Sequence, residues 1–180
     1  MWKEFKPAVR FLLIFVGLYI TGNLVYGFYV SVHGNRPDEI TSLVADQSTW
    51  ILNNIFGYYI NATPNATEPT VSLKTGEHVV LNVFEGCNGI NVFIVFAAFI
   101  VAFNGNTKKS LWFIPLGILV LHVSNLLRII FLYWTALNFH RYFYYVHKYI
   151  FTGVIYAVVF ALWIIWMYQL NERKKNVTTE

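Results

Sequence analysis

Three side chains in this sequence are of types that can act together in nucleophilic catalysis. Cys87, the one cysteine, lies in a Glu-Gly-Cys-Asn-Gly-Ile sequence directly before an apolar run. Arg128 and His147 are carried by two later hydrophobic segments. The cysteine precedes its segment, the arginine lies late in the next, and the histidine just precedes the one after. Segment parity therefore places all three at one membrane face, which indicates a membrane-embedded cysteine nucleophile with two helper residues.

The residues around Cys87 favour a reactive thiol. The attacking species is the thiolate, and an ordinary cysteine with a pKa of about 8.5 is only slightly ionised at neutral pH. Gly86 and Gly89 allow a tight turn, and Asn88 adds to the polar surroundings. If a helix begins at this turn, its free amides and positive dipole end should lower the pKa of the thiol. The alternative is an inert cysteine that packs as a small hydrophobic side chain.

Arg128 is a charged residue inside an apolar segment. Counted from Leu111 at 1.5 Å per residue, it lies ~25 Å along that segment, inside the outer leaflet. A charge near the membrane centre costs ~2.5 to 3.5 kcal/mol on insertion scales, so such residues usually face the bundle interior and have a function. Ser124 and Asn125 precede it by one helical turn and share its face. The alternative is snorkelling of the arginine to the outer headgroups.

His147 opens the last apolar segment, where it could exchange a proton with a leaving amine or a thiol near neutral pH. The alternative is an interfacial histidine within an aromatic belt. His122, in the middle of the preceding segment, is its main rival. No histidine pair has a metal-ligand spacing and there is only one cysteine, so we expect neither a metal site nor a disulfide.

The composition of the chain is that of an integral membrane protein, so membrane helices must position these three residues. The 180 residues are 57% hydrophobic and only 12% charged, whereas a soluble domain has about twice that charged fraction. The basic residues behind the net charge of +4 mostly flank apolar segments, so they do not indicate nucleic-acid binding. We expect an all-α integral membrane protein in the lipid bilayer, with a single domain over 1–180. The expected spans are about 11–30, 88–103, 111–134 and 149–170.

Two features of the remaining sequence complete this expected fold. The first span resembles a signal peptide, but it is long and lacks an Ala-x-Ala site, so we favour an uncleaved helix. The outer segment, 31–86, spaces its apolar residues helically over Ile40 to Ile60, which predicts an amphipathic surface helix. A loop over Asn61 to Thr70 should follow, and then a short β-hairpin formed by 71–73 and 78–84.

The basic residues predict the orientation. Eight of the 13 lysines and arginines fall in the amino terminus, the loop after the second span and the carboxyl-terminal tail, all on one side. The positive-inside rule therefore places both termini in the cytoplasm. Cys87, Arg128 and His147 would then face outward from the cytoplasmic (inner) membrane.

The chain resembles the exosortase/archaeosortase family. The resemblance rests on residues 85–90, on the Asn-Leu-Leu-Arg-Ile sequence around Arg128 and on the downstream His147. The chain is similar to the compact exosortase F subgroup, and the resemblance covers about 79–160. It implies that Cys87, Arg128 and His147 form the catalytic set of a protein-sorting cysteine protease or transpeptidase that needs no cofactor. Larger members have additional amino-terminal helices, so this chain could require a small membrane partner protein.

The resemblance also implies the substrates and the reaction. Substrate proteins of such enzymes end in a short motif, a transmembrane helix and a basic tail. Cys87 would cleave this signal through a thioester, with Arg128 stabilising the oxyanion and His147 transferring protons. Two alternatives stay open. One is a non-catalytic assembly or scaffold protein with Arg128 as an interhelical polar clamp, and the other is a small transporter with Arg128 as an anion site, which the absence of an inverted repeat disfavours.

Overall fold

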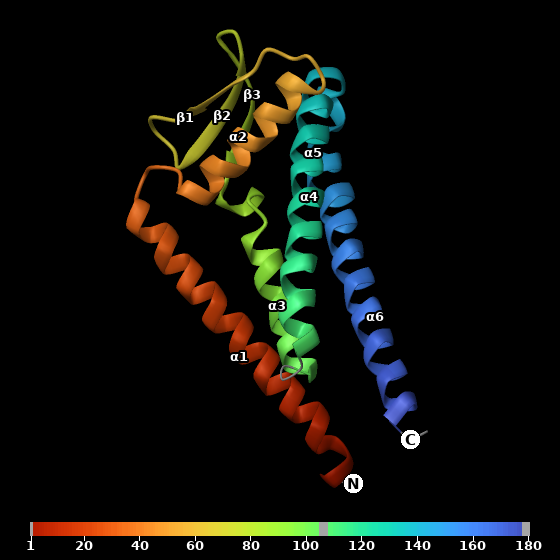
Figure 1. The fold of residues 1–180 in the computed structure, drawn as a ribbon. Coiled ribbons are helices and arrows are strands. Elements are labelled where there is room, and N and C mark those ends of the chain that lie inside the picture. The colour runs from red at the N-terminus through yellow and green to blue at the C-terminus, as the bar shows by residue number, and fades with distance from the viewer. Residues whose placement is uncertain (1, 105–107, 178–180) are drawn as a thin grey trace.

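Long helices packed side by side carry a small mixed module at one end of the molecule (Figure 1). The structure, a computed structural model, describes residues 2–104 and 108–177. The long helices are α1 (Trp2–His33), α3 (Ile90–Asn104), α4 (Lys108–Asn138) and α6 (Phe151–Val177). Between α4 and α6 lie the 3₁₀ turn η2 (His140–Tyr142), the single turn α5 (Phe143–Tyr145) and the π-helical segment η3 (Val146–Ile150).

Three of these helical segments are long and apolar enough to cross a membrane: Phe5–His33, Lys108–Asn138 and Phe143–Gln169. The expected all-α membrane fold is therefore confirmed. The expected second span is shorter than predicted, because α3 has 15 residues and begins only at Ile90. At 1.5 Å per residue its length is ~22 Å, less than the ~30 Å of a bilayer core.

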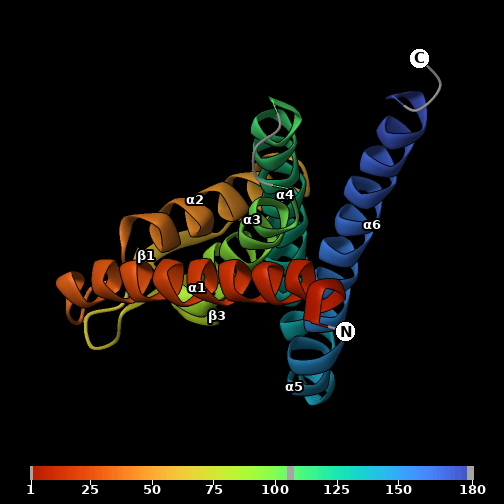
Figure 2. The same ribbon diagram turned by 90° about the horizontal axis from the view of Figure 1, so that it is seen from below.

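Aromatic side chains hold the helices together. Phe99 of α3 stacks on Trp163 of α6, with 4.1 Å between ring centroids. The same Phe99 ring also meets Phe11 of α1 edge to face, with 5.5 Å between centroids. Figures 1 and 2 show that α1 runs obliquely to α4 and α6. The buried core of this helical part consists of Phe96, Ile100, Phe113, Leu121, Val159 and Trp166.

The small module, called the outer module here after the predicted outer segment 31–86, combines one amphipathic helix with a three-stranded antiparallel sheet. The helix, α2 (Glu39–Asn54), ends earlier than the predicted Ile60, and Gly57 with φ +72° follows its end. The sheet has the order β1-β2-β3, with strands Asn61–Pro64, Thr70–Thr75 and His78–Phe84. Strands β2 and β3 pair antiparallel and form the hairpin that the sequence predicted. The predicted loop over 61–70 was wrong in part, because its first four residues pair with β2 as β1.

The outer half of α4 belongs to the core of this module. Side chains of α2, β2, β3 and α4 form one buried cluster, which also contains Cys87. The cluster members from α4 are Ile129, Ile130, Leu132 and Tyr133. Arg128 therefore precedes a stretch of α4 that packs against the sheet and α2, and α4 continues beyond it as far as Asn138.

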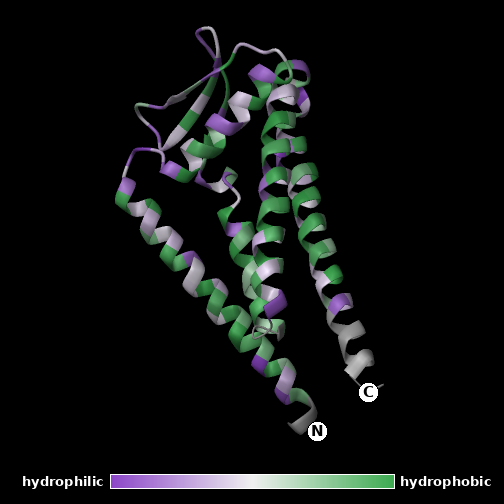
Figure 3. Cartoon of the chain, in the orientation of Figure 1, coloured by the Kyte–Doolittle hydropathy of each residue, from purple (hydrophilic) through white to green (hydrophobic). Residues whose placement is uncertain are grey.

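Hydropathy divides the molecule along its length. Hydrophobic residues follow the long helices, and hydrophilic residues gather in the outer module (Figure 3). The start of α1, the start of α4 and the end of α6 lie together at the opposite end of the molecule (Figure 1). The basic residues Lys6, Arg10, Lys108 and Lys109 belong to that end.

Candidate active site

The turn that carries Cys87 connects the sheet to the membrane. Strand β3 ends at Phe84, the 3₁₀ turn η1 covers Glu85–Cys87, and α3 begins at Ile90. Asn88 caps this helix, because its Oδ1 accepts a hydrogen bond of 3.1 Å from the Ile90 amide. The helix therefore begins three residues after Cys87, and its first amide is bound to Asn88 rather than to the sulfur.

Gly89 makes this turn geometrically possible. Its φ is +88°, a conformation that L side chains rarely adopt. A Cβ atom here would also lie 3.3 Å from Cγ of Asn125 in α4. Gly86 is required for a steric reason, because a Cβ atom at that position would lie only 2.4 Å from the ring of Phe84.

Arg128 and Asn125 of α4 both contact Cys87. The Nη2 atom of Arg128 donates to Cys87 Sγ at 3.9 Å, and Nδ2 of Asn125 donates to the Cys87 carbonyl oxygen at 2.8 Å. Among the described residues, the buried Nε atom of Arg128 has no hydrogen-bond partner. Ser124, predicted to join this patch, instead donates to the Val120 carbonyl of its own helix at 2.8 Å. The turn is thus held by Asn125, and Arg128 keeps one buried donor, Nε, unpaired while its Nη2 contacts the sulfur.

The thiol itself is buried, with 4% of Cys87 exposed. Burial raises its pKa, whereas the nearby Arg128 guanidinium and a backbone hydrogen bond from Phe84 lower it. Burial has the larger effect, so the pKa lies above its ordinary value. This raised pKa differs from the expected lowering, because burial outweighs the effect of Arg128 and of the backbone hydrogen bond.

His147 lies on the π-helical segment η3, within the last helical segment rather than before it. The predicted start of that span near 149 was too late, because the helical segment begins at Phe143. The His147 ring stacks on Phe143 with 5.9 Å between centroids, and it interacts electrostatically with Arg128. π-helical turns re-aim side chains and are frequent at functional sites. The structure thus places His147 within electrostatic range of Arg128, whereas no contact between His147 and Cys87 is found among the described residues.

The rival histidine has a different environment. His122 Nε2 lies 2.8 Å from Oε1 of Gln47, which joins α4 to α2. Its ring also meets Phe93 at 6.4 Å. These contacts make His122 of α4 a link to both α2 and α3, and it lies more than one helical turn before Arg128.

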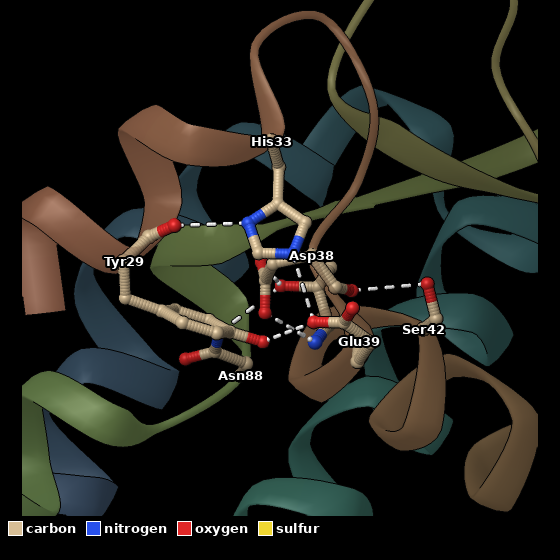
Figure 4. A network of polar contacts seen from close by, with 7 residues as sticks. Tyr29, His33, Asp38, Glu39, Ser42 and Asn88 are labelled. Carbon is tan, nitrogen blue, oxygen red and sulfur yellow. Dashed lines mark hydrogen bonds and ion pairs between the residues drawn. The ribbon is translucent and has the colours of Figure 1, made fainter.

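Sequence reasoning missed a group of polar residues behind the turn. Asn88 donates to the hydroxyl of Tyr26 at 2.6 Å and to the hydroxyl of Thr41 at 3.0 Å. Asp38 caps α2 and binds the Thr41 amide and hydroxyl (Figure 4). The position of Asp38 before an apolar periodic stretch is a helix-start signal that could have been noticed. No local signal indicates that Tyr26, inside the first span, reaches this turn.

Comparison with known proteins identifies a family. A protein-family model described as transmembrane exosortase (Exosortase_EpsH) matches residues 7–169. Searches among curated proteins and solved structures found no match. The matched range includes most of the helical part, the outer module and the three residues Cys87, Arg128 and His147.

Proposed function

This chain belongs to the transmembrane exosortase family, and we propose that it is a membrane-embedded cysteine protease or transpeptidase. Its substrates would be exported proteins that end in a short motif, a transmembrane helix and a basic tail. The substrate helix would lie beside the long helices and present its scissile peptide bond at the end of the molecule that carries the outer module.

The chemistry requires a nucleophile, an oxyanion donor and a proton carrier. Cys87 transfers its proton to His147, and the sulfur attacks the scissile carbonyl carbon. Arg128 stabilises the oxyanion that forms. The C–N bond then breaks, and His147 returns the proton to the leaving amine, which departs with the membrane anchor. An incoming amine or water, deprotonated by His147, attacks the thioester and releases Cys87.

The contact between Arg128 and Cys87 is the observation that carries this proposal. The guanidinium lies 3.9 Å from the sulfur, and its buried Nε has no partner among the described residues. A buried, unused donor costs free energy, so its retention is explained if it binds a group that appears only during the reaction. Planar guanidinium donors suit a developing oxyanion next to the attacking sulfur.

We also propose that the protein lies in the cytoplasmic (inner) membrane with both termini in the cytoplasm and the outer module outside. The basic residues at the end opposite the module support this orientation. In a Cys87→Ala background, Tyr59→Cys at a 90% exposed position of the module should react with an impermeant maleimide in intact cells. Lys109→Cys, at the other end, should react only after the membrane is opened; the reverse pattern would contradict the orientation.

A scaffold role, with Arg128 as a polar clamp, is the competing proposal. It is favoured by the position of Cys87 within a buried apolar cluster. The two proposals differ in what they predict for Cys87→Ala, which removes the sulfur and leaves a small apolar side chain in the cluster.

The test compares cells that carry the wild-type gene, a deletion and the Cys87→Ala allele. Mass spectrometry quantifies the carboxyl-terminal peptides of membrane proteins that end in an apolar span and a basic tail. We expect such tails to be removed in wild-type cells and retained with both the deletion and Cys87→Ala, at unchanged abundance of the variant. Normal tail removal by Cys87→Ala would exclude the protease and favour the scaffold.

A further inference from the structure

The polar residues behind the Cys87 turn form a connected network that the chemistry above does not use. We propose that Thr41 of α2, together with Tyr26 of α1, is a positioning residue that holds the Cys87 turn in register with Arg128 by binding the side chain of Asn88. This inference rests on the proposed function for its effect on cleavage, but its effect on the thiol can be measured independently.

Both N–H donors of the Asn88 side chain are used in hydrogen bonds. An asparagine amide has two N–H donors. In this structure they go to the hydroxyl oxygens of Tyr26 and Thr41, while Oδ1 accepts from the Ile90 amide. Asn88 is 1% exposed, so water does not replace either partner readily. Loss of one hydroxyl would leave a buried donor unpaired, and the turn would have to shift to satisfy it.

Asp38 fixes the direction of the Thr41 hydroxyl. Thr41 has one hydroxyl proton, which it donates to Oδ2 of Asp38, so a lone pair is left to accept from Asn88. The other carboxyl oxygen of Asp38 accepts from the Thr41 amide at 2.9 Å. Asp38 is 3% and Thr41 0% exposed. The start of α2 is thereby tied to the turn through Thr41.

Three elements therefore hold one short turn. Tyr26 holds it from α1, because its hydroxyl also lies 3.5 Å from the Glu85 carbonyl oxygen. Thr41 holds it from α2, and Asn125 holds the Cys87 carbonyl from α4. The Arg128–Cys87 contact joins two of these elements and depends on the turn staying in place. If the turn loosens, the sulfur should move away from Arg128 and become more exposed.

Loss of the Thr41 hydroxyl should therefore change two measured rates in opposite directions. Thr41→Val keeps the shape of the side chain but removes its hydroxyl. Tail removal per molecule of enzyme should fall by about 10- to 100-fold, as for misplacement of a catalytic group by about 1 Å. The rate at which N-ethylmaleimide alkylates Cys87 in the purified full-length protein should instead rise several-fold. Because Cys87 is the chain's one cysteine, total labelling reports this site alone.

Thr49 provides a matched control on the same helix. It is 8% exposed, and its hydroxyl has no hydrogen-bond partner among the described residues. Thr49→Val should therefore leave both rates unchanged, whereas Thr41→Ser, which keeps the hydroxyl, should restore both. Tyr26→Phe, which removes the second partner of Asn88, should reproduce the pattern of Thr41→Val if that variant fails to accumulate.

The outcomes separate this inference from the proposed function. Wild-type alkylation and tail removal in Thr41→Val and Tyr26→Phe would overturn the positioning role. So would equal effects of Thr41→Val and Thr49→Val, which would indicate a general weakening of α2. If alkylation changes as expected but Cys87→Ala still removes tails, the positioning network stands and the protease proposal fails.

Discussion

Nη2 of Arg128 lies 3.9 Å from Sγ of Cys87, although the two residues are 41 positions apart in the chain. One comes from the outer half of a long apolar helix and the other from the turn that ends a β-strand. Asn125, one helical turn before Arg128, fixes the backbone of that turn. The helix therefore supplies both the side chain that holds the Cys87 turn and the charge that faces the Cys87 sulfur.

Replacement of Arg128 by lysine tests whether this charge acts through its geometry. Arg128→Lys keeps a cation near the sulfur but loses the planar set of donors. We expect the variant to accumulate in the membrane at a near-normal level and to lose tail removal by about 10²- to 10³-fold, as for an oxyanion donor. Tail-peptide quantification, normalised to enzyme abundance, measures this. Full activity of Arg128→Lys would show that a simple positive charge suffices.

The raised pKa of Cys87 predicts a pH dependence. Because burial holds the folded-state pKa above the ordinary value, the thiolate fraction should increase only above the pH at which a free cysteine ionises, about 8.5. The midpoint of a pH profile of alkylation should thus be higher for the folded protein than for the same protein in denaturant. Arg128→Leu, which removes the cation that lowers this pKa, should move the midpoint higher still. A folded-state midpoint below that of the denatured chain would contradict the assignment.

The two partly buried histidines should behave differently. His147→Ala removes the proposed proton carrier near Arg128, so tail removal should fall strongly while the protein remains folded. His122→Ala removes the hydrogen bond to Gln47, which costs about 0.5–1.5 kcal/mol of stability. Its activity per folded molecule should stay close to wild type, and Gln47→Leu should match it in thermal stability. If His122→Ala is inactive and His147→Ala is active, the histidine has been assigned to the wrong position.

Gly89 should be more sensitive to substitution than another glycine in a similar conformation. Gly89→Ala places a Cβ atom at φ +88° and 3.3 Å from Asn125, whereas Gly34→Ala, at φ +59°, meets nothing within 4 Å. Both variants acquire backbone strain of about 1–2 kcal/mol. Only Gly89→Ala should disturb the hydrogen bond from Asn125 to the Cys87 turn and lower activity as well as melting temperature. Equal activity of the two variants would show that this hydrogen bond does not matter for function.

The helical part of the fold and the family could be predicted from the sequence, because long apolar runs and the motifs around Cys87 and Arg128 are local signals. The boundaries were less predictable. Asn88 and Gly89 delay the start of α3 through a cap and a positive φ, and the aromatic stretch from Phe143 extends the last segment. Strand β1 is short and ends in Pro64, so its pairing with β2 left no clear pattern.

The candidate site was predictable only where one residue type stood out. A lone cysteine and a charge in an apolar run mark Cys87 and Arg128, and the structure brings them together. The partners of Asn88 are not visible in this way, because Tyr26 and Thr41 lie 62 and 47 positions away in the chain. Such contacts follow from how α1 and α2 pack around the turn.

A covalent intermediate is the most direct test of the central claim that Cys87 attacks the substrate. The measurement is the intact mass of the purified enzyme after incubation with a substrate that still carries its tail. The comparison of carboxyl-terminal peptides in wild-type and deletion cells identifies this substrate. We expect an adduct on Cys87 whose mass equals that of the substrate without its tail. Hydroxylamine should release this adduct, as it does a thioester, and Cys87→Ala should not form it. Tail removal that proceeds with no such adduct, and equally well with Cys87→Ala, would contradict attack by Cys87.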